Sequence, residues 1–121
     1  MKLENIKFKA KRLDGKGWAI GDLLHSYENG AIIVPTEGGG AFSVDTSTVC
    51  QFTGLKDCEG NEIWEGDIVE REIYDPFKDS SKVKAVIEYM DGAFVAITDG
   101  IAYSLYFKYI KVIDNKFDKE K

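Results

Sequence analysis

Side chains alternate between apolar and polar with a period of two residues along most of this 121-residue chain, and few folds accommodate such a pattern. Near the start, Ile6, Phe8 and Ala10 alternate with lysines, which gives an extended segment one apolar and one charged side. Similar short segments recur toward the end, and none has a helical period of 3.6 residues sustained over about ten residues. The sequence therefore predicts a mainly β protein with little helix.

Turn-forming residues divide the chain into short pieces. Asn29-Gly30 and Asp91-Gly92 are two-residue hairpin signals, and Pro35 ends a strand because it lacks an N–H donor. Leu105 to Lys108 can form one helical turn. The expected extended segments are residues 6–11, 16–27, 31–34, 48–52, 62–64, 67–73, 82–90, 93–97, 101–104 and 110–113.

The length fits one ordinary domain or two very small ones. We expect residues 1–60 to form an N-terminal β-meander. Residues 61–121 contain a series of short strands with a helical turn before the last strand, which is typical of a small SH3-like β-barrel. The two regions could also form one composite domain.

The formal net charge is −5, and the whole deficit lies in residues 55–121, with ten basic and fifteen acidic side chains. This balance excludes a protein that attracts nucleic acid through its overall field, but a local basic face is still possible. The longest apolar runs are far shorter than the ~18–20 residues that span a bilayer, and the start lacks a secretory pattern. The spacing of Cys50 and Cys58 matches neither a redox pair nor a zinc site. We expect reduced thiols, a cytoplasmic protein and no membrane contact, with a Cys50–Cys58 disulfide as the alternative.

Catalytic groups are scarce. The single histidine, His25, has no neighbouring nucleophile or orienting carboxylate in the sequence. Six carboxylates fall between Glu59 and Glu72, and such a group could hold a divalent ion, although their alternation also fits a solvated strand face. We predict that the protein is not an enzyme and carries no cofactor, with a metal-assisted enzyme as an alternative.

Two clusters are candidate binding sites. A basic strand with a nearby aromatic side chain is typical of single-stranded nucleic-acid binding, although lysines also protect strand edges. This candidate consists of Lys7, Lys9, Lys11, Arg12 and Trp18. An aromatic cluster near the expected helical turn is a candidate protein-binding surface, although core packing would also explain it. Its members are Tyr103, Tyr106, Tyr109 and Phe94.

Residues 51–69 read QFTGLKDCEGNEIWEGDIV. This stretch resembles the signature of the YopX family, small proteins encoded by bacteriophages and prophages. Ile6 to Ala10 resembles the family's opening, with lysines at 9 and 11 in place of the usual arginine and tryptophan, and Val44-Asp45-Thr46 resembles a further segment. The resemblance covers about residues 6–70. It implies a phage origin, the cytoplasm of a bacterial host and a β-rich fold, but no reaction and no catalytic residue.

The sequence thus predicts a non-catalytic accessory module that binds a protein of the host or of the phage and forms a homo-oligomer. The alternative is a single-stranded nucleic-acid-binding protein that uses the basic N-terminal strand.

Overall fold

The computed structural model describes residues 2–73, 81–105 and 109–118. These residues contain eleven strands, all antiparallel where their pairing is resolved, and three short 3₁₀ helices. The prediction of a mainly β protein with little helix is therefore confirmed. The chain divides into two compact units, Met1–Phe52 and Thr53–Lys121, whereas the expected division lay between residues 60 and 61.

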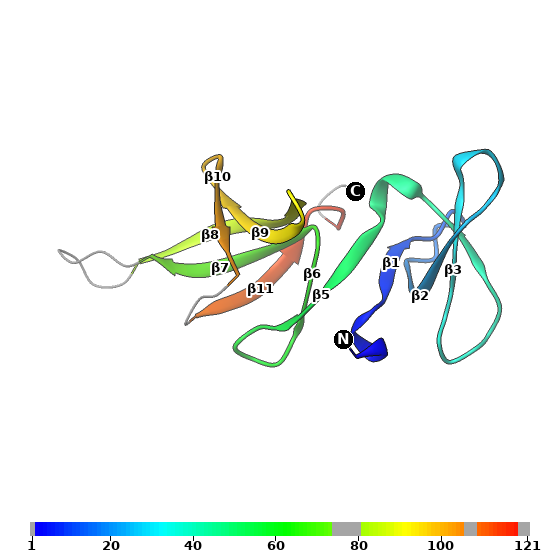
Figure 1. Ribbon diagram of the computed structural model, residues 1–121, viewed down its shortest axis with the longest axis horizontal. Helices are drawn as coiled ribbons and strands as arrows, with labels where there is room; N and C mark the ends of the chain where they lie inside the picture. Colours follow the sequence, from blue (N-terminus) through cyan, green and yellow to red (C-terminus); the bar gives the residue numbers. More distant parts are fainter. Residues whose placement is uncertain (1, 74–80, 106–108, 119–121) are drawn as a thin grey trace. The chain divides into compact units, whose positions relative to one another are not determined.

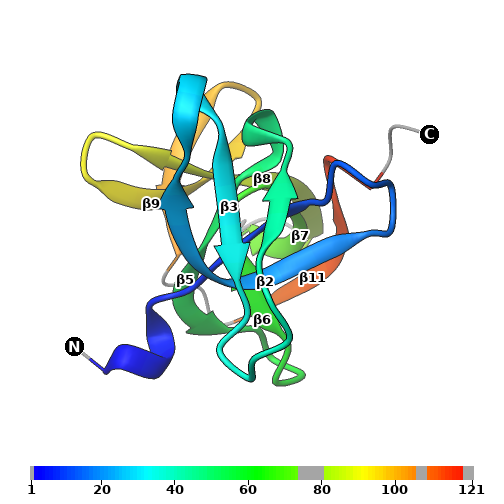
Figure 2. The ribbon, with the colours of Figure 1, turned by 90° about the vertical axis from the view of Figure 1, so that its right-hand side faces the viewer.

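The first unit is built on an antiparallel sheet whose strands follow the order β4-β3-β2-β1-β5. Its strands are β1 (Phe8–Lys11), β2 (Trp18–His25), β3 (Ala31–Val34), β4 (Phe42–Val44) and the start of β5 (Cys50–Lys56). The 3₁₀ helices are Leu3–Asn5, Tyr27–Asn29 and Thr46–Thr48. Figure 2 shows β2 and β3 side by side within this unit.

Three alanines and two branched aliphatic side chains form the core of the first unit. Ala10, in the centre of β1, is fully buried, as the alternation of its segment predicts. The other buried members are Ala19, Ala31, Ile33 and Val44, with Phe8, Leu23, Phe42 and Val49 packed around them. Three alanines on adjacent strands let this face pack closely, so little space is left for additional atoms.

One expectation for the first unit is wrong, and one strand was missed. Asn29-Gly30 does not form a two-residue hairpin turn, because His25 pairs with Ala31 and the connection between them is five residues long. The left-handed backbone conformation falls at Glu28 and Asn29 rather than at Gly30. Strand β4 was not predicted, because its three residues are too few to show an alternation.

The second unit contains the later part of β5 and an antiparallel sheet in the order β10-β9-β8-β7-β11 (Figure 1). Its strands are β6 (Glu62–Trp64), β7 (Asp67–Ile73), β8 (Ser81–Met90), β9 (Ala93–Thr98), β10 (Ile101–Ser104) and β11 (Ile110–Asn115). The two-residue turn at Asp91-Gly92 is confirmed, since Met90 pairs with Ala93. Within the described residues this sheet has two ends, β10 and β11, so the SH3-like barrel remains a prediction. Of the expected helical turn, residues 106–108 lie outside the described residues.

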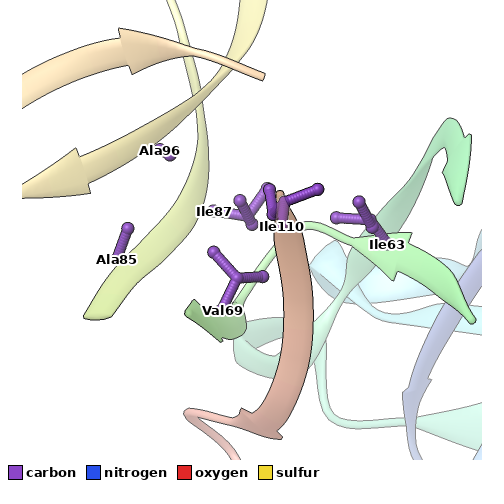
Figure 3. Packing of buried hydrophobic residues seen from close by; sticks show 6 residues of the cluster. All are labelled: Ile63, Val69, Ala85, Ile87, Ala96 and Ile110. Atoms are coloured by element: carbon purple, nitrogen blue, oxygen red, sulfur yellow. The ribbon is translucent and has the colours of Figure 1, made fainter. Parts of the chain in front are cut away.

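Six buried side chains form the core of the second unit. They come from β6, β7, β8, β9 and β11, as Figure 3 shows, and are Ile63, Val69, Ala85, Ile87, Ala96 and Ile110. Leu105 and Val112 pack against them. The two-residue alternation of the strands explains which of their side chains are buried, because alternate residues of a strand share one face of its sheet.

Candidate binding surfaces

The predicted basic strand lies against aromatic rings. Lys11 is directly opposite Trp18 in the β1–β2 pairing, and the Nζ atoms of Lys9 and Lys11 lie 4.7 and 4.6 Å from the centre of the Trp18 ring. Lys7 Nζ lies 4.8 Å from the centre of the Phe52 ring. We call Lys7, Lys9, Lys11, Trp18 and Phe52 the basic–aromatic face. Its five members share one side of the sheet, opposite to Ala10, but Phe52 is itself buried, so the three lysines and Trp18 form the accessible part.

Arg12 does not join the basic–aromatic face. Its guanidinium carbon lies 4.0 Å from the centre of the Phe42 ring, and Phe42 packs against the core on the other side of the sheet. Arg12 also forms an ion pair with Asp14. Since adjacent residues of an extended chain point to opposite sides, Lys11 at the end of β1 and Arg12 directly after it cannot both face one ligand.

The structure separates the predicted protein-binding aromatics. Tyr103 stacks against Arg71, whose guanidinium carbon lies 4.0 Å from the ring centre, on the side of the sheet that carries Val69. Tyr109 lies on the opposite side, where its hydroxyl donates to Glu70 Oε1 at 3.2 Å. Tyr106 lies outside the described residues.

Phe94 lies on the same side of the sheet as Tyr103. Together with Tyr89 they form a surface that crosses strands β8, β9 and β10. The Phe94 ring meets Tyr89 edge to face, with the ring centres 5.3 Å apart. Tyr103 is opposite Ala96, two residues along β9 from Phe94, and Ile101 continues the same side of β10. We call Tyr89, Phe94, Ile101 and Tyr103 the apolar strip. The sequence prediction missed Ile101, although Ile101 and Tyr103 are two residues apart in one strand and must therefore lie on the same side of the sheet.

Two aspartates of the signature, Asp57 and Asp67, have structural roles. Asp57 is buried in a turn, where its carboxylate accepts from the backbone N–H groups of Glu59 and Asn61 at 2.9 and 2.8 Å. It also accepts from the Val112 N–H of β11 at 2.9 Å. One of these four hydrogen bonds, from Val112, joins the turn to the last strand, and the other three, including one from the Asn61 side chain, stabilise the turn itself.

Asp67 fixes a second turn of the signature to the same strand. Its Oδ2 accepts from the backbone N–H of Trp64 at 2.7 Å, and its Oδ1 accepts from Asn115 Nδ2 at 3.0 Å. Asp67 and Asn115 are both buried. These contacts give the Asp67 carboxylate a structural role in this unit.

Two further carboxylates of the segment contact lysines. Glu59 pairs with Lys111 at 3.2 Å, and Glu70 lies 4.0 Å from Lys82. Within the described residues, no three carboxylate, histidine or cysteine side chains converge as metal ligands. His25 ends β2 at the surface.

Stability should depend on pH through Asp57. Burial by itself raises the pKa of Asp57, but the donated N–H groups outweigh burial and hold the pKa below its ordinary value of 3.8. A lowered folded-state pKa stabilises the fold above the unfolded-state pKa, and this stabilisation is lost as the pH falls through the folded-state value. We therefore expect the free energy of unfolding to fall in acid below about pH 4.

Urea unfolding of the natural protein and of Asp57→Asn at a series of pH values measures this effect. The variant should be less stable at neutral pH, and the difference between the two proteins should shrink in acid. The other carboxylates titrate equally in both proteins and cancel in the comparison. A difference that stays constant down to pH 3 would exclude Asp57 as the titrating group.

Among the described residues, no helix combines the length and apolar character needed to cross a bilayer. Comparison with known families matches residues 8–117 to the family described as YopX protein, well beyond the segment on which the resemblance rests. No curated protein matches the chain. Because the family match covers nearly the whole chain, the chain belongs to the YopX family of phage-type proteins.

Proposed function

We propose that this protein is a non-catalytic accessory module that binds a protein of the bacterial host or of the phage through the apolar strip. The observation that carries the proposal is the exposure of large apolar side chains on one side of the second sheet. Tyr89 and Ile101 each keep 56% of their surface exposed, and Tyr103 keeps 36%. Contiguous exposed apolar residues on a soluble surface are typical of interaction sites.

The composition of the strip fits a protein partner. Tyrosine supplies a rigid ring together with a polar hydroxyl and is enriched among the residues that dominate binding energies. The half-buried Phe94 pairs directly with Tyr89 across the strands, so the exposed Tyr89 ring is held by an edge-to-face contact. A supported ring loses little conformational entropy on binding, which favours affinity.

Capture from host lysate tests the proposal. Tagged natural protein, Ile101→Ser and Tyr27→Ser are used as baits, and the captured proteins are identified by mass spectrometry. Tyr27 is a matched control, because it is an almost fully exposed aromatic residue of the first unit. We expect Ile101→Ser to lose a specific partner that Tyr27→Ser retains, with at least about a tenfold drop in recovery.

Equal recovery by both variants would exclude the strip as the binding surface. Each variant is first checked for an unchanged thermal unfolding midpoint, so that a loss of capture reports binding and not folding.

A second candidate function is single-stranded nucleic-acid binding by the basic–aromatic face. The stacking of Lys9 and Lys11 on Trp18 favours it, since basic side chains beside a ring are the elements of such sites. A base that stacks on Trp18 must displace a lysine, which weakens this candidate. Nuclease treatment of half of each lysate separates the two functions, because only a nucleic-acid ligand disappears.

The proposal includes two further expectations. The chain forms a homo-oligomer, which light scattering measures, and the protein acts in the host cytoplasm. A metal-assisted enzyme would instead be revealed by an unfolding temperature that rises with added divalent ions.

A further inference from the structure

We propose that strand β10 binds an extended segment of the partner protein as an added β-strand, and that this segment alternates apolar with basic residues. The proposal rests on the proposed function, because it assigns a binding mode and a ligand chemistry to the apolar strip. Three observations support it: an unprotected sheet edge, the direction of its backbone groups and the charge of the second unit.

Among the described residues, strand β10 is an edge strand without the usual protection. It is at one end of the strand order, and all four of its residues are exposed. It contains no charged residue, no proline and no bulge. The opposite edge, β11, carries Lys111 and Asp114 and is interrupted by a bulge between Val112 and Asp114. Natural proteins use such devices against unwanted pairing, so an edge that lacks them is suited to receive a strand.

The turn before β10 determines which backbone groups point outward. Asp99 and Gly100 have φ values of 51° and 76°, and they connect the paired residues Thr98 and Ile101. Two residues with positive φ form a type I′ turn, which closes on a hydrogen-bonded pair. Since hydrogen-bonded and non-hydrogen-bonded pairs alternate in an antiparallel ladder, the N–H and C=O groups of Ala102 and Ser104 point away from β9. These are the groups that an added strand would pair with.

The side chains of β10 define the pattern of the ligand. Ile101 and Tyr103 belong to the apolar strip, so every second residue of an added strand would lie beside them and should be apolar. The residues between would lie beside Ala102 and Ser104, whose small side chains leave room for long ones. The edge therefore favours an alternating segment of about four to six residues.

The charge of the second unit indicates which residues should alternate with the apolar ones in the added segment. The second unit, residues 53–121, carries ten basic and fifteen acidic side chains, and Asp99 is exposed at the start of the edge. A lysine- or arginine-containing segment is attracted by this excess of negative charge, whereas a second copy of the same unit is repelled. We therefore assign the edge to a basic partner segment and not to self-pairing.

A synthetic peptide tests the proposal on the full chain. The probe is a capped peptide of about ten residues that alternates valine and lysine, and its counterpart alternates valine and glutamate. We expect the lysine peptide to bind and to slow the hydrogen exchange of the Ala102 and Ser104 amides, as measured by NMR. The glutamate peptide should bind at least about tenfold more weakly.

Ala102→Pro is the decisive variant. Proline is tolerated on an edge strand where the lost N–H faces solvent, so the fold should be retained while a donor to the added strand is removed. Ala102→Ser is the matched control, because it alters the same side chain but keeps the N–H. We expect Ala102→Pro to weaken binding of the lysine peptide about tenfold and Ala102→Ser to leave it unchanged. Equal binding by both variants, or binding without protection of the two amides, would overturn the proposal.

Failure of this proposal can be distinguished from failure of the proposed function. If Ile101→Ser abolishes capture of a partner and Ala102→Pro does not, the strip binds proteins but not by strand addition. If neither change affects capture, the strip is not the interface and both proposals fail. A dimer in light scattering that Ala102→Pro dissociates would assign the edge to a second copy and overturn the choice of ligand.

Discussion

Replacing Asp67 with alanine should lower the free energy of unfolding by about 3 kcal/mol, because two buried hydrogen bonds lose their acceptor. The backbone N–H of Trp64 and the side-chain amide of Asn115 both donate to this carboxylate. Chemical unfolding followed by circular dichroism measures the change. Asp67→Asn keeps the shape and one acceptor oxygen, so it should be less harmful.

Glu88→Ala is the matched control for this prediction. Glu88 is a partly exposed carboxylate of the same sheet whose nearest described ion-pair partner, Lys116, is 4.0 Å away. Its removal should change the free energy of unfolding by less than about 0.5 kcal/mol. An Asp67→Ala protein as stable as Glu88→Ala would show that the signature aspartate does not support the fold.

Gly21→Ala should destabilise the first unit by at least about 2 kcal/mol, since an added methyl group collides with backbone atoms that cannot rotate away. A Cβ atom at this position would overlap the Val34 carbonyl oxygen and lie 2.7 Å from Pro35 Cα. Gly21 also has a φ of 158°, which residues with a side chain rarely adopt, so backbone strain adds to the cost of the collision. Relief requires that β2 and β3 separate where Asp22 pairs with Val34.

Hydrogen exchange of segments 18–34 and 81–98 measures this effect separately in the two units. We expect faster exchange in the first segment and no change in the second. Asp22→Ala, an exposed change at the next residue of β2, serves as the control and should leave both segments unaffected. Unchanged exchange in Gly21→Ala would mean that the strand pairing can absorb a methyl group.

Alternation predicted most strands because it reflects burial on one side of a sheet. Residues 31–34, 62–64, 67–73 and 101–104 were predicted with the boundaries that the structure has. The expected segments 82–90 and 93–97 differ from β8 and β9 by one residue at one end. Turns were less predictable, because a dipeptide such as Asn29-Gly30 allows several conformations and the pairing of His25 with Ala31 selects a longer connection.

The candidate sites were only partly predictable, because sequence proximity ignores which side of a strand a residue faces. Lys9, Lys11 and Trp18 do meet, whereas Arg12 lies on the other side of the sheet. Tyr103 and Tyr109 are separated for the same reason. Edge strand β10 was predicted as a strand, but its place at the end of the sheet depends on long-range pairing that no local pattern encodes.

The contacts of Asp57 and Asp67 with β11 have a consequence for biosynthesis. Their partners follow 55 and 48 residues later, and a ribosome adds about 5–20 residues per second. For several seconds the nascent second unit therefore lacks Ile110 in its core as well as the groups that its two turns bind. We expect this unit to stay unfolded and accessible to chaperones until its last strand leaves the exit tunnel, and then to fold in one cooperative step.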